Sequence, residues 1–190
     1  MLAHLRMRAF LGKPLPVYGP ISGFILTNQN ASAFALGDLK GHVWVADVFF
    51  TRCAGPCLKM SRQMKELQDT LLPTSGARLV SLTTDPLYDT PPVLKNYAQR
   101  FGADPSRWLF LTGSRQEVTN LINSLKLTAI EKKPGEAASA SDLFIHSTIF
   151  VIIDKQGQLR GIFETMGEGI APDQVKAQIR AAIRRLEREP

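Results

Sequence analysis

A nearly unbroken apolar segment, Val43 to Phe50, most constrains what this chain can fold into. Seven of its eight residues are apolar, and Asp47 is the exception. A strand that is apolar on both faces must be covered on both faces, as happens inside a sheet that carries helices on each side. The chain has 190 residues, of which 44% are hydrophobic, and this suits one soluble domain with such a core.

Other segments repeat this alternation between buried strands and amphipathic helices. We predict further strands at 78–83, 108–111, 148–153 and 159–163, and helices at 56–72, 91–101, 115–125 and 171–188. Early in the chain, 23–27 and 33–36 flank a polar turn and predict a hairpin. The pattern indicates an α/β fold: a central mixed sheet flanked by helices, with an N-terminal hairpin.

Two segments lack a regular pattern. Residues 1–20 contain three prolines, and we expect an irregular lead-in to a domain that spans residues 21–190. Residues 132–141 are rich in Gly, Ala and Ser and predict a mobile loop.

The only two cysteines, Cys53 and Cys57, follow the apolar segment directly, with Ala-Gly-Pro between them. A helix is expected to begin at Pro56, and the positive end of its dipole favours thiolate over thiol. Two such thiolates can form a disulfide and transfer electrons, or they can hold a soft metal. A dithiol at a strand-to-helix turn within a βαβ pattern is typical of thioredoxin-like proteins.

The stretch from Phe49 to Cys57, FFTRCAGPC, resembles the Cys-x-x-x-Cys signature of the Sco (SenC) family. The similarity continues, in the family's order, through TDPLYDTP at 84–91, VLKNYAQRFG at 93–102 and His146-Ser-Thr before a strand that ends in DKQG. It covers about residues 20 to 187. The resemblance implies a thioredoxin-like sandwich and a copper-binding factor that helps to assemble the CuA centre of cytochrome c oxidase.

The resemblance also implies a ligand set and a setting. Cys53, Cys57 and His146 would bind copper as Cu(I) or Cu(II), and the chain would act as a metallochaperone. Its partners would be the oxidase subunit that carries CuA or another copper acceptor, together with a thiol reductant or a copper-donor protein. The location would be extracytoplasmic and close to a membrane, at the periplasmic face of the inner membrane or its equivalent. No membrane anchor is evident in the sequence.

Asp47 keeps an enzymatic alternative open. A carboxyl group in the middle of a buried strand, six residues before Cys53, could accept the proton of a thiol in a Cys53–Cys57 redox pair. The chain would then be a thiol-disulfide oxidoreductase that reduces the cysteines of a copper-accepting partner. One feature argues against a general reductase. Thioredoxins have a proline immediately before the strand that faces the dithiol, and residues 144–148 contain no proline.

Charge and three departures from the family pattern bear on partners. The net charge is +6, but no aromatic residues are interleaved with the basic ones, so we expect no nucleic-acid partner. Leu58 stands where many family members have proline. Leu87 and Ile145 stand where an acidic residue is common, and these two changes concern partner docking and the surroundings of His146.

Overall fold

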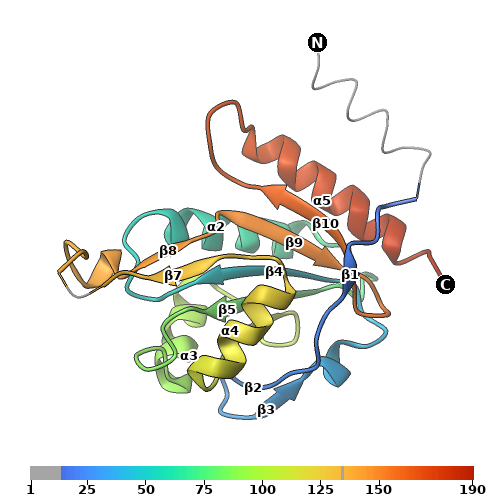
Figure 1. Ribbon diagram of the computed structural model, residues 1–190. Coiled ribbons are helices and arrows are strands. Elements are labelled where there is room, and N and C mark those ends of the chain that lie inside the picture. The colour runs from blue at the N-terminus through green and yellow to red at the C-terminus, as the bar shows by residue number, and fades with distance from the viewer. Residues whose placement is uncertain (1–13, 134) are drawn as a thin grey trace.

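The computed structural model describes residues 14–133 and 135–190, and its centre is a curled eight-stranded sheet (Figure 1). The strands lie in the order β1-β10-β9-β4-β5-β6-β2-β3. Their bounds are Gly19–Pro20 (β1), Ile25–Asn28 (β2), Ala33–Ala35 (β3), Trp44–Phe49 (β4), Arg78–Thr83 (β5), Trp108–Thr112 (β6), Ile149–Ile153 (β9) and Gln158–Glu164 (β10).

The apolar segment found in the sequence is β4, in the middle of this sheet. It pairs in parallel with β5 from Trp44↔Arg78 to Phe49↔Thr83, and β5 pairs in parallel with β6. On its other side β4 pairs antiparallel with β9. The sheet is therefore mixed, as predicted, and every residue of β4 is buried.

Helices cover both faces of the sheet and create two apolar cores. The long helices are α2 (Pro56–Thr70), α3 (Pro91–Arg100), α4 (Arg115–Ser124) and α5 (Pro172–Leu186). Apolar residues of α2, α3 and α5 pack in one core, and those of α4 pack in the other beside β2 and the 3-10 helix η1 (Leu36–Leu39). Within the described ranges, no helix combines the length and hydrophobicity that crossing a membrane requires.

The predicted N-terminal hairpin is confirmed as β2 and β3. The side-chain oxygen of Asn28 accepts hydrogen bonds from the backbone N–H groups of Asn30 (2.9 Å) and Ser32 (3.1 Å), and Ala31 takes a φ of 60° in the turn. β2 also pairs with β6, so the hairpin extends the main sheet.

The described part of the predicted lead-in packs on the sheet. Gly19 and Pro20 form β1 against β10, and Leu15 is buried. The guanidinium of Arg160 donates to the carbonyls of Pro16 (3.0 Å) and Leu15 (3.1 Å). Residues 1–13 lie outside the described residues, and the domain boundary near residue 20 stays a prediction.

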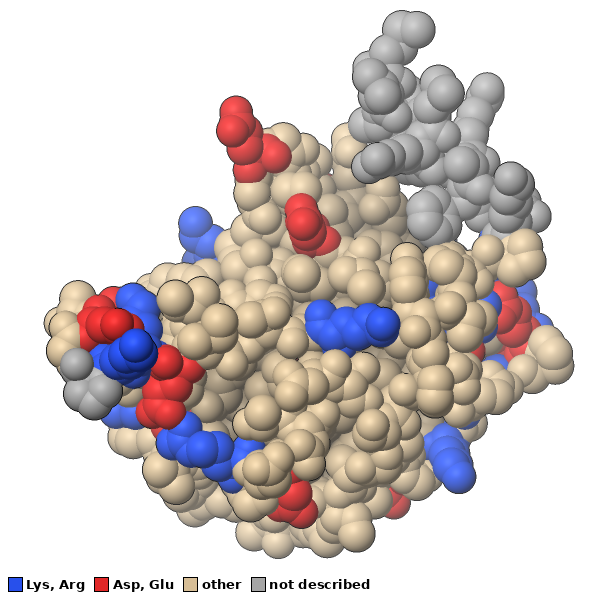
Figure 2. All heavy atoms as spheres, in the orientation of Figure 1, with Lys and Arg blue, Asp and Glu red and all other residues tan. Residues whose placement is uncertain are grey.

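A two-stranded ribbon separate from the main sheet was not predicted. It consists of β7 (Ala129–Glu131) and β8 (Phe144–His146), which are antiparallel, and the turn η2 (Ala140–Asp142) precedes β8. Sequence analysis missed it because each strand has only three residues, too few to show a period. Ion pairs support it: Lys132 with Asp142 (2.6 Å), and Glu131 with Arg115 of α4. Figure 2 shows acidic and basic side chains interspersed at this end of the molecule.

Candidate metal centre

The cysteine loop connects the end of β4 to the start of α2. Cys53 is in the loop, and Cys57 is the second residue of the helix after Pro56. Both cysteines are buried and reduced, whereas residues 54–56 between them are exposed. The loop therefore places two sulfur atoms just below the surface.

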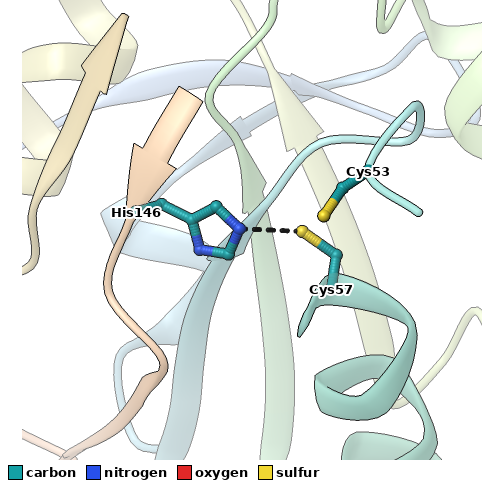
Figure 3. A group of neighbouring side chains, drawn as sticks. All are labelled: Cys53, Cys57 and His146. Atoms are coloured by element: carbon teal, nitrogen blue, oxygen red, sulfur yellow. Dashed lines mark hydrogen bonds between the residues drawn. The ribbon is translucent and has the colours of Figure 1, made fainter. Parts of the chain in front are cut away.

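His146, the last residue of β8, directs its ring at these sulfurs (Figure 3). Its Nε2 lies 2.9 Å from the Sγ of Cys57. The ligand atoms of Cys53, Cys57 and His146 all lie within 4.8 Å of one another. Metal–sulfur and metal–nitrogen bonds of about 2.0–2.3 Å span separations of this order. The structure thus brings together the three residues that the sequence nominated, although they come from a loop, a helix and the separate ribbon.

Phe50 supports this arrangement. Its ring centroid lies 5.2 Å from that of Phe144 on β8 and 6.0 Å from the imidazole of His146, which it meets edge to face. On the other side of the imidazole, Nδ1 lies 3.1 Å from the carbonyl oxygen of Ser147. That contact leaves Nε2 facing the sulfurs with a lone pair available for a metal.

The two thiols have very different proton affinities. The pKa of Cys53 is lowered to about 4, and the main cause is a hydrogen bond from Cys57. Burial acts in the opposite direction. Contacts with His146 and with the backbone N–H groups of Cys57 and Gly55 lower the pKa further. The same hydrogen bond and burial raise the pKa of Cys57 well above its ordinary value. For His146, burial lowers the pKa, but the Cys53 thiolate and the Ser147 carbonyl outweigh it and raise the pKa. Cys53 is therefore the ionised thiol near neutral pH.

Asp47 lies on β4, and its side chain is 1% exposed. One carboxyl oxygen accepts a hydrogen bond from Ser81 Oγ (2.6 Å), and Ser81 in turn accepts one from Trp108 Nε1 (2.9 Å). The other oxygen, Oδ2, has no hydrogen-bond partner among the described residues. Burial raises the pKa of Asp47 to about 7, against smaller lowering effects of Ser81 and His146.

Ser81 is a supporting residue that sequence analysis missed. It is directly opposite Asp47 in the β4–β5 register. The sequence contained one indication of this role, a single serine within the predicted strand 78–83. A parallel alignment of this strand with 43–50 would have paired the serine with Asp47.

Comparison with known proteins identifies the family. The SCO1/SenC family model matches residues 19–184 of the chain. The chain belongs to the SCO1/SenC family. Among curated Sco relatives, the SCO1 protein homolog of Bacillus subtilis is 32% identical over 145 residues, which cover 76% of this chain and 73% of that protein. A Stutzerimonas stutzeri protein that is named for copper binding is 28% identical over 149 residues, which cover 77% of this chain and 70% of that protein. The chain spans 64–65% of the length of three SCO2-like Rickettsia proteins.

Solved Sco structures share the thioredoxin-like fold of this chain. A SCO1/SenC family lipoprotein of Bacillus anthracis superposes with a TM-score of 0.75 at 31% identity, over 93% of this chain and 98% of that one. BsSco gives a TM-score of 0.72 at 30% identity, over 90% and 98%. It is described as a member of the Sco family of cytochrome c oxidase assembly proteins and as having a disulfide switch.

The two apolar residues that were noted in the sequence, Leu87 and Ile145, are on the surface. Leu87 is 76% exposed in the loop after β5, and Ile145 is 57% exposed beside His146. Because side chains alternate along a strand, Ile145 lies on the face of the ribbon opposite to the imidazole. The side chain of Ile145 therefore contributes to the outer surface of the ribbon and points away from the ligand atoms.

Proposed function

We propose that this Sco-family chain binds copper through Cys53, Cys57 and His146 and passes it to an acceptor protein. The convergence of the two sulfurs and one imidazole nitrogen within 4.8 Å carries the proposal. Thiolates are soft ligands that select Cu(I), and imidazole also suits copper. The name of the Stutzerimonas stutzeri relative supports the choice of metal.

The surroundings of the sulfurs suit transfer as well as binding. Three ligands leave the ion short of a closed four-coordinate shell, so an incoming ligand can bind before another leaves. Residues 54–56 between the two cysteines are exposed, so an acceptor can contact the cysteine loop directly. In this mechanism the cysteine and histidine ligands are exchanged one at a time for those of the acceptor.

For the partner we propose the cytochrome c oxidase subunit that carries CuA. The description of BsSco as a member of a family of oxidase assembly proteins supports this assignment. A copper-donor protein would load the site with copper. A thiol reductant would keep Cys53 and Cys57 reduced. We propose an extracytoplasmic, membrane-associated location, which the lipoprotein from Bacillus anthracis supports.

Anaerobic titration of the reduced protein with Cu(I), in competition with a chromogenic chelator, tests metal binding. We expect one equivalent to bind tightly, and we expect Cys53→Ala and His146→Ala to weaken binding by more than about a hundredfold, because losing a ligand exceeds the loss typical of outer contacts. His42→Ala is the matched control, since His42 contacts the Gly76 carbonyl and lies just before β4, at the end of that strand opposite to the cysteines. Unchanged tight binding in both site variants would overturn the proposal.

Asp47 favours a second candidate function, a thiol-disulfide oxidoreductase. The Cys53 thiolate would attack a disulfide of the partner, which forms a mixed disulfide and releases one partner thiolate. Asp47 would then take the proton of the Cys57 thiol, and the resulting thiolate would attack Cys53 Sγ and release the second partner sulfur as a thiolate. The partner thiolates take up one proton from Asp47 and one from solvent. The chain's two thiols become a disulfide, and the partner's disulfide becomes two thiols.

Single-turnover kinetics with a model disulfide separate this function from copper transfer. If Asp47 accepts the proton, Asp47→Asn should slow release of the second thiol and leave formation of the mixed disulfide unchanged, with no dependence on copper. Equal rates for both steps in the two proteins would exclude a proton-accepting role for Asp47.

A further inference from the structure

A second loop, residues 84–90 between β5 and α3, lies against the cysteine loop. Its Asp89 is fully buried and accepts three hydrogen bonds. Two come from Thr51 of the cysteine loop, through its backbone N–H (3.1 Å) and its hydroxyl, and one comes from the hydroxyl of Thr83 at the end of β5. One carboxyl group therefore joins the residue two positions before Cys53 to the adjacent strand.

These bonds begin where the backbone pairing of the sheet ends. The last residue pair of β4 and β5 is Phe49 with Thr83, followed by one hydrogen bond from the Thr84 N–H to the Phe49 carbonyl. Beyond that point side chains hold the two segments together. A second contact has the same effect, since Arg52 forms an ion pair with Asp85 and its guanidinium lies 4.2 Å from the ring centroid of Tyr88.

We propose that Asp89 is a positioning residue of the metal centre. Asp89 fixes Thr51 and so determines where the Cys53 sulfur lies relative to Cys57 and His146. Its hydrogen bonds go to threonines and not to the sulfurs, so it acts through the cysteine loop. Ligands that are held in place before the metal arrives bind it more tightly than ligands that must first be ordered. The proposal rests on the proposed copper function for its metal readout, but the hold on the loop can be measured without metal.

The test compares Asp89→Ala with Asp154→Ala, a matched control. Asp154 is also a buried carboxylate with several donors, the backbone N–H groups of Gln156 and Gln158 and the Arg160 guanidinium. It follows β9, whose Ile153 pairs with Trp44, so it lies at the end of β4 opposite to the cysteines. Both variants should unfold at lower temperature than the wild type.

Only Asp89→Ala should change the centre. We expect it to weaken Cu(I) binding by about 10–100-fold, as is typical when an outer contact of a metal site is lost. In the metal-free protein, hydrogen exchange of the Thr51 amide measured by NMR should become at least about tenfold faster, because its acceptor is gone. Asp154→Ala should leave both values unchanged.

Thr51→Val is a milder variant, which removes the hydroxyl donor and keeps the N–H. It should shift both readouts in the same direction by less, and it decides the question if Asp89→Ala does not fold. Wild-type Cu(I) affinity and wild-type Thr51 exchange in the folded variants would overturn the proposal. If the wild type itself fails to bind Cu(I), the copper function fails, and the exchange measurement still confirms or refutes the role of Asp89 in holding the loop.

Discussion

Replacing Asp47 with asparagine should make the protein's stability respond differently to pH. Burial raises the pKa of this carboxyl from the ordinary 3.8 to about 7 in the folded chain. Because each pKa unit corresponds to about 1.4 kcal/mol, keeping an ionised Asp47 buried is unfavourable by roughly 4 kcal/mol. Between pH 4 and pH 7 the unfolded chain releases this proton and the folded chain retains it. The contribution of Asp47 to the stability of the wild type should therefore fall over this range, and above pH 7 it should stay constant.

The Asp47→Asn variant has no proton to release at this position, so its stability lacks this dependence. The new amide nitrogen would replace Oδ2, which has no partner among the described residues, and an unsatisfied buried donor is unfavourable by about 1–3 kcal/mol at every pH. The informative quantity is therefore the change with pH in the difference between the two free energies of unfolding. We expect this difference to move in favour of Asp47→Asn by up to about 4 kcal/mol between pH 4 and pH 8.

Urea unfolding of the reduced, metal-free proteins at each pH measures this difference. Asp104→Asn is an opposite-sign control, because hydrogen bonds from Ser106 lower the pKa of Asp104. The free energy of unfolding of the wild type should increase relative to that of Asp104→Asn as pH rises through the acid range. A difference between wild type and Asp47→Asn that stays flat from pH 4 to pH 8 would show that the Asp47 carboxyl has an ordinary proton affinity, and the argument for its proton-accepting role would fall with it.

Two further predictions concern the thiols and a buried ion pair. With its pKa near 4, Cys53 should react with iodoacetamide at pH 6 much faster than Cys57, whose pKa is raised. Peptide mapping by mass spectrometry measures the labelling of each cysteine, and equal labelling would contradict this assignment. Arg160→Ala should lower the free energy of unfolding by about 3–5 kcal/mol, since it leaves buried Asp154 without its ion-pair partner. The exposed ion pair of Arg115 and Glu131 provides the control. In the same denaturant titration, Arg115→Ala should change the free energy of unfolding by less than about 1 kcal/mol. Similar losses in both variants would contradict the expected effect of burial.

Residue patterns predicted the main sheet well because its strands are buried on both faces. Such strands appear as continuous apolar runs, and 43–50, 78–83 and 148–153 became β4, β5 and β9 within one residue at each end. The helices were similarly clear, although 56–72 and 171–188 end two residues earlier in the structure, at Thr70 and Leu186. Helix ends depend on local capping contacts, which the apolar period does not encode.

The site was predicted less evenly. Cys53 and Cys57 stand out in any reading of the sequence, but His146 was nominated through the family resemblance, because a contact 89 residues apart leaves no local pattern. Ser81 and Asp89 were missed for a related reason. Each is a polar residue whose partner, Asp47 or Thr51, becomes its neighbour only when β4 and β5 lie side by side.

The ribbon that carries His146 makes the metal centre a joint between two separate parts of the fold. Cys53 lies in the loop after β4 and Cys57 lies in α2. The third ligand, His146, belongs to β8, whose strand partner within the described residues is β7 alone. The imidazole is therefore held by the short link to Thr148, whose carbonyl accepts hydrogen bonds from Thr165, and by side-chain packing between the ribbon and the main sheet. The packing of Phe144 on Phe50 is therefore one of the contacts that set the distance between the imidazole and the two sulfurs.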